Sequence, residues 1–117
     1  MRARTTILAV MACFMFSSAA FGQRVTGSID GSVSDISGAV LPGVEITVIN
    51  DATGVTRATI TNETGLYNVP LLRSGIYSVQ ASLPGFRTEL RRGVLVEVDR
   101  TARVEVQLEV GVVTETV

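Results

Sequence analysis

The sequence predicts an all-β sandwich of seven strands that follows a cleaved secretion signal. Turn-forming Gly, Pro, Asn and Asp residues recur along residues 23–110 at the spacing of about 8–12 residues that is typical of β-sandwiches. The runs between these turns are rich in Val, Ile and Thr, and several alternate apolar with polar residues. No window in this part of the chain has the i, i+3, i+4, i+7 apolar spacing of a helix, so we expect no helix there.

Residues 1–22 are predicted to be a signal peptide. Arg2 and Arg4 precede an apolar run from Ile7 to Phe16, and small residues come after that run. This order is typical of secretory signals, and we expect cleavage between Gly22 and Gln23.

Three alternatives to this cleavage are less favoured. Cleavage after Ala20 fits the small-residue rule almost as well. A transmembrane anchor needs about 20 apolar residues, and Ser17 and Ser18 interrupt this run. A lipoprotein signal at Cys13 is disfavoured because the apolar run continues beyond the cysteine. No cysteine lies beyond the signal, so the exported domain must fold without a disulfide.

The strands are expected, in chain order, at residues 27–34, 44–50, 55–61, 66–69, 76–83, 86–98 and 102–110. The first carries glycines on its inward face, which leave room for a neighbouring strand or a bulge. The inward face of the third is ambiguous. The fourth is expected to end before Pro70, because proline cannot donate to a ladder. The sixth is expected to break near Arg92 and Gly93, and residues 111–117 alternate like the start of a further strand.

Period-two alternation predicts which residues face the core. Phe86 is expected to cover one end of the core, and the Tyr77 hydroxyl is expected to form one hydrogen bond. The residues expected to face inward are, strand by strand, Val25, Gly27, Ile29, Gly31 and Val33; Val44, Ile46 and Val48; Tyr77, Val79, Ala81 and Leu83; Val94, Val96 and Val98; and Ala102, Val104, Val106, Leu108 and Val110.

Composition excludes most enzyme chemistry. The chain has no His, one Cys and ten basic residues that are all Arg. It therefore has no Ser–His–Asp triad, no His-ligated metal, no cysteine zinc site and no Schiff-base lysine. We expect no catalytic residues, no metal and no cofactor. Without Arg2 and Arg4, eight arginines face eleven acidic residues, a balance that argues against nucleic acid as a partner.

Two groups of charged residues are candidate ion sites. The first group is taken as acidic loop residues that could bind calcium: Asp30, Asp35, Asp51 and Glu63. They lack the dense D-x-D-x-D spacing of calcium loops, so a turn-forming role is favoured.

Arg87, Arg91 and Arg92 form the second group, which is a candidate patch for a phosphate, sulfate or acidic glycan. The alternative is ion pairing with nearby Glu89, Glu97 and Asp99 on a solvated face.

Carbohydrate binding is a further candidate function. Sugar-binding surfaces usually stack aromatic rings on sugar faces, and after the signal the chain offers only Tyr67, Tyr77 and Phe86. At least two of these rings are expected in the core, which weakens this interpretation.

Several short sequence motifs, which occur in the same order as in that family, resemble the carboxypeptidase regulatory-like domain, and the resemblance covers about residues 25–110. The matching motifs are Gly31–Asp35 (GSVSD), Ser37–Gly43 (SGAVLPG), Val44–Asn50 (VEITVIN), Thr61–Tyr67 (TNETGLY), Leu71–Val79 (LLRSGIYSV) and Pro84–Phe86 (PGF). The resemblance implies a transthyretin-like, Greek-key β-sandwich and a non-enzymatic module for interaction and positioning.

The run Leu108–Val117 looks like the end of the N-terminal extension of TonB-dependent outer-membrane receptors. The chain is therefore expected to have three segments: the signal at 1–22, the sandwich at 23–110 and a strand-like tail at 111–117, which is truncated or leads to a further domain. The resemblance also implies the periplasm or outer membrane of a Gram-negative bacterium, or secretion. The expected partner is a protein, such as the receptor plug or barrel, docked through strand edges, with Val112, Val113 and Val117 as a candidate docking tail. The alternative is a free-standing carbohydrate-binding or adhesive module.

Overall fold

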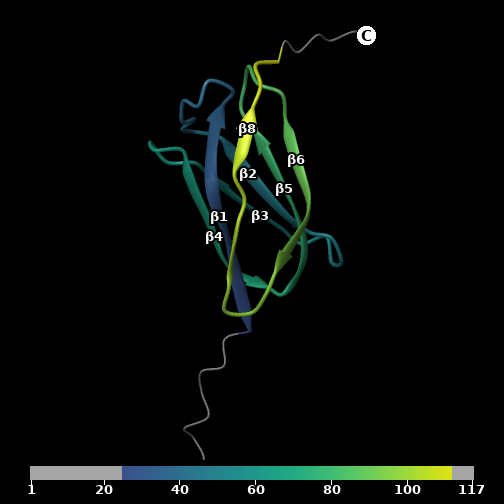
Figure 1. Ribbon diagram of the computed structural model, residues 1–117. Helices are drawn as coiled ribbons and strands as arrows, with labels where there is room; N and C mark the ends of the chain where they lie inside the picture. The colour runs from purple at the N-terminus through teal and green to yellow at the C-terminus, as the bar shows by residue number, and fades with distance from the viewer. Residues whose placement is uncertain (1–24, 112–117) are drawn as a thin grey trace, which may run out of the picture.

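The computed structural model describes residues 25–111 and arranges them as two β-sheets packed face to face (Figure 1). The strands are β1 (Thr26–Asp35), β2 (Glu45–Asn50), β3 (Thr56–Ile60), β4 (Leu66–Arg73), β5 (Gly75–Ser82), β6 (Glu89–Val96), β7 (Thr101–Arg103) and β8 (Val106–Leu108). The predicted all-β sandwich is confirmed, although the last predicted strand is divided into two.

The first sheet is organised around β1. This strand pairs antiparallel with β4 on one side, and on the other side it pairs parallel with β7 and then with β8. The second sheet has the order β3-β2-β5-β6, and all its neighbours are antiparallel. The outer edges are therefore β4 and β7–β8 in one sheet and β3 and β6 in the other.

Alternation in the central strands produces the core as predicted. Val44, Ile46 and Val48 are fully buried, and Val79 and Ala81 lie opposite two of them on β5. Burying each such valine or isoleucine stabilises the fold by about 1.5–3 kcal/mol. The buried apolar core comprises Ile29, Val33, Val44, Ile46, Val48, Tyr67, Val69, Leu72, Tyr77, Val79, Ala81, Val96, Val106 and Leu108, with Phe86 and Leu83 packed against it.

The prediction that the fourth strand ends before Pro70 is wrong. β4 runs on to Arg73, because an irregularity in the ladder absorbs the proline. Gly27 pairs with Leu72 and Ile29 with Val69, so two residues of β4 lie opposite one residue of β1. This is the geometry of a β-bulge, which is one of the places where a sheet tolerates proline.

Three predicted core residues are exposed instead. Val25 precedes β1, and Val98 lies in the turn that joins β6 to β7. Val110 is 71% exposed because the chain leaves the first sheet after β8. There the backbone N–H of Arg87 donates to Glu109 O at 2.8 Å, which pairs this segment with the connection between β5 and β6.

The two predicted close approaches to β1 are confirmed at its glycines. A Cβ added at Gly31 would lie 1.8 Å from Val104 O, since the backbone between β7 and β8 crosses this residue. The Tyr67 hydroxyl donates to the same carbonyl oxygen at 2.6 Å. Burial, and to a lesser extent the nearby Asp30 carboxylate, raises the pKa of Tyr67 to about 12.

Polar side chains fix the turns at one end of the sandwich. The Thr61 hydroxyl is buried, donates to Leu41 O at 2.7 Å and accepts from the Val44 N–H at 2.9 Å. Asp35 Oδ1 accepts from the backbone N–H groups of Ser37 and Ala39 and from the Ser37 hydroxyl. The bond from the serine hydroxyl is the main reason why the pKa of Asp35 lies below its ordinary value.

The described chain enters the sandwich at one end and leaves it at the other. β1 and β8 run in the same direction, so Thr26 and Leu108 lie at opposite ends of the first sheet (Figure 1). Residues 25–111 contain no helix that could span a membrane.

Candidate functional site

The β6–β7 turn is held tightly against the start of β1. The Asp99 N–H donates to Thr26 O at 2.9 Å, and the Ser28 N–H donates to Arg100 O at 3.0 Å. A Cβ at Gly27 would lie 2.2 Å from Glu97 O, so only glycine permits this approach. The turn therefore has a fixed position above β1.

The β4 bulge lies on the other side of β1. Pro70 and Leu71 face Ser28, and Leu71 adopts a φ of 58°. Its side chain is 72% exposed, and Arg57 Nη1 donates to its carbonyl oxygen at 3.4 Å. An apolar, non-glycine residue is thus held in the left-handed region without burying its side chain.

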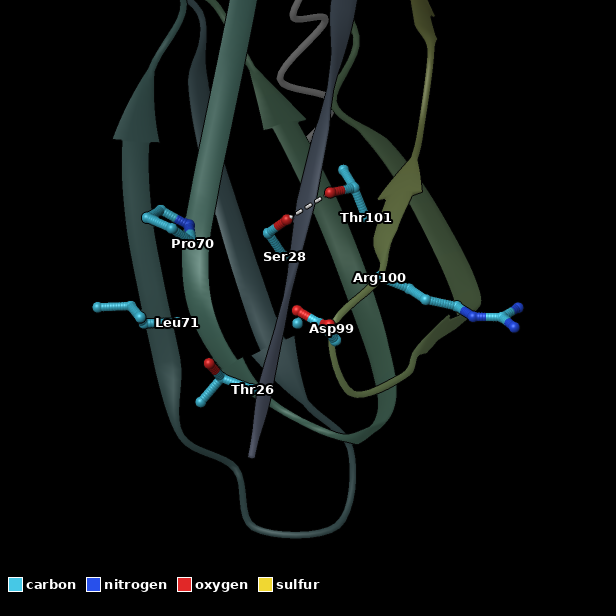
Figure 2. A pocket seen from close by; sticks show the side chains of 8 residues that line it. Thr26, Ser28, Pro70, Leu71, Asp99, Arg100 and Thr101 are labelled. Atoms are coloured by element: carbon cyan, nitrogen blue, oxygen red, sulfur yellow. Dashed lines mark hydrogen bonds between the residues drawn. The ribbon is translucent and has the colours of Figure 1, made fainter. Parts of the chain in front are cut away.

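Between the bulge and the turn lies a cavity of about 450 Å³, which we call the bulge hollow (Figure 2). Ser28 Oγ and Thr101 Oγ1, which both line this cavity, are 2.9 Å apart and hydrogen-bonded to each other. The Arg100 side chain points away from it and pairs with Glu97 at 3.3 Å. The lining residues are Thr26, Gly27, Ser28, Pro70, Leu71, Asp99, Arg100 and Thr101.

Asp99 is the one carboxylate in the lining of this hollow. Its φ is 59°, and within residues 25–111 no arginine forms an ion pair with it. Chemically, the hollow offers hydroxyls, one carboxylate and backbone groups, which can bind a ligand by hydrogen bonds.

The loop carboxylates proposed as calcium ligands are mostly engaged elsewhere. Asp51 Oδ1 accepts from the Ser78 hydroxyl at 2.9 Å, Asp30 lies 4.0 Å from Arg103, and Asp35 fixes its own turn. Within the described part of the chain, no three His, Cys, Asp or Glu residues gather closely enough to hold a metal ion. The turn-forming role fits Asp35, whereas Asp30 lies within β1 and not in a turn.

Two of the three arginines of the predicted anion patch have acidic neighbours. Arg87 Nη1 lies 3.9 Å from Glu109 Oε2, and Arg91 Nε lies 3.8 Å from Glu89 Oε1. Arg92 is exposed on β6. Ligand binding by this group stays a prediction.

Other predicted residues lie outside the described range. Gly22 and Gln23 belong to the predicted cleavage site, and Val112, Val113 and Val117 to the predicted docking tail. Both predictions stand as expectations.

Within residues 25–111, the aromatic residues do not form a surface for stacking sugars. Tyr67 and Tyr77 are each 4% exposed and donate their hydroxyls to the backbone carbonyls of Val104 and Arg73. Phe86 packs against the core.

Sequence reasoning missed the bulge hollow. Ser28 and Thr101 are 73 positions apart, and parallel pairing between β1 and β7 brings them together. The glycine at position 27 was the available signal, because it predicted a close approach without identifying what approaches. The sequence marked Asp99 only as a possible ion-pair partner.

Comparisons with known proteins agree with this architecture. The family model of the carboxypeptidase regulatory-like domain matches residues 28–109. No curated protein sequence matches the chain significantly.

Three solved structures share the fold at low identity. The TIE protein of Bacillus anthracis is 23% identical with a TM-score of 0.63, and the match covers 74% of this chain and 17% of that one. A proposed carbohydrate-binding protein of Bacteroides uniformis is 20% identical with a TM-score of 0.56, covering 69% and 40%. The minor pilin of Streptococcus agalactiae is 14% identical with a TM-score of 0.60, covering 80% and 48%. The chain thus spans less than half the length of these structures.

A catechol 1,2-dioxygenase of Acinetobacter radioresistens also shares the fold, at 11% identity and a TM-score of 0.61 over 75% of this chain and 53% of its own. The fold alone therefore does not assign an activity.

Proposed function

Because the chain belongs to the carboxypeptidase regulatory-like domain family, we propose that it is a non-enzymatic, exported module that positions the parts of a longer cell-envelope protein. The proposed host is a TonB-dependent outer-membrane receptor, with this chain as its N-terminal extension on the periplasmic side.

The observation that carries this proposal is the separation of the two ends of the sandwich. β1 has ten residues, and a strand rises about 3.3 Å per residue, so the module keeps the segments attached to its two ends about 30 Å apart. With the predicted signal removed, a partner docked at the N-terminal end of the sandwich is held at this distance from the segment that follows β8.

The chemistry of the chain supports a non-enzymatic role. The sequence contains no histidine, and the Asp30 and Asp51 carboxylates contact Arg103 and Ser78. The usual general bases are therefore scarce. Hydrolysis above the buffer background on a panel of glycosides and esters would contradict this part of the proposal.

The exposed strand edges supply the proposed docking mode. β3 lies at the edge of its sheet, and most of its residues are exposed. An edge strand can accept an extended segment of a partner through its free backbone groups. We expect an envelope protein, or the host itself, to dock in this way.

A free-standing carbohydrate-binding or adhesive module is the alternative. The buried rings of Tyr67 and Tyr77 remove the usual stacking platform, which is why positioning is preferred.

The test is the size and location of the native product. An antibody against residues 23–110 is used on fractionated source cells. A band far larger than the 12.4 kDa chain in the outer-membrane fraction is expected. A band near the size of the mature chain in the periplasm or the medium would refute the receptor assignment and favour the free-standing module.

A further inference from the structure

We propose that the bulge hollow is a binding site for a neutral saccharide unit, held by hydrogen bonds to Asp99 and to the Ser28–Thr101 hydroxyl pair. This goes beyond the proposed function and does not depend on the host protein.

The charge of the lining favours a neutral ligand. The residues of the hollow include one carboxylate, Asp99, and one guanidinium, Arg100, whose side chain is turned away toward Glu97. Because Arg100 is paired with Glu97, the charge that remains in the lining is the Asp99 carboxylate, which disfavours an anionic ligand. A bare divalent cation is also disfavoured, since calcium takes about six to eight oxygen ligands, several of them carboxylates.

The hydrogen-bonding groups suit vicinal hydroxyls. When one hydroxyl of the Ser28–Thr101 pair donates to the other, the second keeps its own hydrogen free to donate outward. The Asp99 carboxylate is a strong acceptor and lines the same hollow as this pair (Figure 2). A polyol can therefore donate to the carboxylate and accept from the free hydroxyl at the same time.

The hollow is built in advance of any ligand. Among residues 25–111, Leu71 and Asp99 are the two non-glycine residues with positive φ, and both line this hollow from opposite sides. Such conformations cost of order 1 kcal/mol each and tend to gather at functional sites. Gly27 and the two backbone hydrogen bonds of the turn fix the position of Asp99.

The size of the hollow agrees with this ligand. Its volume of about 450 Å³ lies within the range of about 300–1,000 Å³ for small-molecule sites. Because its lining contains no aromatic ring, we expect a dissociation constant no tighter than the millimolar range.

The experiment is an amide NMR titration of the purified, isotope-labelled chain. The probes are glucose, galactose, N-acetylglucosamine and their β-1,4-linked dimers, each added to about 50 mM so that millimolar affinities are reached. At least one is expected to shift the amides of residues 26–28, 70–72 and 97–101 selectively. Calcium chloride and sodium acetate are titrated in parallel.

Two isosteric variants at left-handed positions separate binding from folding. Asp99→Asn removes the charge but suits the same φ, since asparagine tolerates this region well, and it is expected to weaken binding about tenfold or more. Leu71→Asn reports on folding alone: it is expected to unfold no earlier than the parent, because the leucine side chain is exposed and asparagine tolerates this φ well. Glu63→Gln, in an exposed turn outside the lining, is the charge-matched control and is expected to bind as the parent does.

Three outcomes would overturn the proposal. The first is that no sugar shifts these amides at about 50 mM, a concentration that detects even very weak binding. The second is that calcium or acetate shifts them while the sugars do not. The third is that Asp99→Asn, still folded, binds as tightly as Glu63→Gln.

Discussion

Replacing Gly31 with alanine tests whether the backbone crossing at Val104 holds the first sheet together. The added Cβ would lie 1.8 Å from Val104 O, 2.7 Å from Val104 C and 2.9 Å from the Tyr67 hydroxyl. To restore ordinary contact, the crossing backbone must move by roughly 1.5 Å. Such a shift breaks the Tyr67–Val104 hydrogen bond of 2.6 Å and the bond of 2.8 Å from the Val104 N–H to Asp30 O.

The cost is set by these contacts. Two hydrogen bonds contribute about 1 kcal/mol each, and overpacking costs about 1–3 kcal/mol, so we expect Gly31→Ala to lower the free energy of unfolding by about 3–5 kcal/mol. A domain of this length is stable by roughly 4–13 kcal/mol. Urea denaturation followed by circular dichroism measures the difference, and a fall in Tm of at least about 12 °C should accompany it.

Gly54→Ala is the matched control. Gly54 has a φ of 73° and no heavy atom within 4 Å of an added Cβ, so alanine there meets conformational strain without a clash. That strain costs about 1–2 kcal/mol. If Gly31→Ala proves no more destabilising than Gly54→Ala, the crossing backbone is not the constraint that we infer.

Three further variants test individual polar contacts. Tyr67→Phe should cost about 1–2 kcal/mol at neutral pH, because the Val104 carbonyl loses its donor. Burial raises the pKa of Tyr67 to about 12 in the folded protein, so its contribution to stability is complete below pH about 10 and is lost as the pH rises toward 12. The urea midpoint of the parent protein should therefore fall between these pH values. An equal fall in Tyr67→Phe would contradict this assignment. Thr61→Val removes the partners of the buried Val44 N–H and of the partly buried Leu41 carbonyl, and should cost about 2–4 kcal/mol. Thr59→Val, on the β3 edge, should cost much less. Asp35→Asn should reduce the loss of stability at acid pH. Because the pKa of Asp35 in the folded protein lies below its ordinary pKa of 3.8, its contribution to stability is present above pH 3.8 and is lost as the pH falls through the pKa of the folded protein. Unchanged acid unfolding of this variant would show that the turn contacts of Asp35 are not stabilising.

The sequence predicted the central strands well because their environment is set by local periodicity. β2 and β5 are buried on one face, and alternation alone identifies Ile46 and Val48 as the inward residues of β2, with Val44 just before it. The glycines of β1 also predicted close approaches correctly, since their missing side chains have no other evident use in a strand.

The failures lie where tertiary pairing overrides local rules. Pro70 indicated a strand end, but a bulge with Leu71 at positive φ lets β4 continue. Val110 fits an alternating pattern, but the segment around it leaves the first sheet and pairs with the connection between β5 and β6. The bulge hollow could not be predicted for the same reason: it depends on the parallel pairing of β1 with β7, and no local turn signal in the sequence indicates that pairing.

The parallel placement of the terminal strands also has a mechanical consequence. β1 forms three register pairs with β7 and three with β8, all parallel. A force that pulls residues 25 and 111 apart therefore slides these strands along each other, and the interstrand bonds are loaded together rather than opened one at a time. We therefore expect the sandwich to need the highest unfolding force when tension is applied between its two ends. A pull across the sheet, such as one on the β2–β3 loop, should open the structure at a lower force.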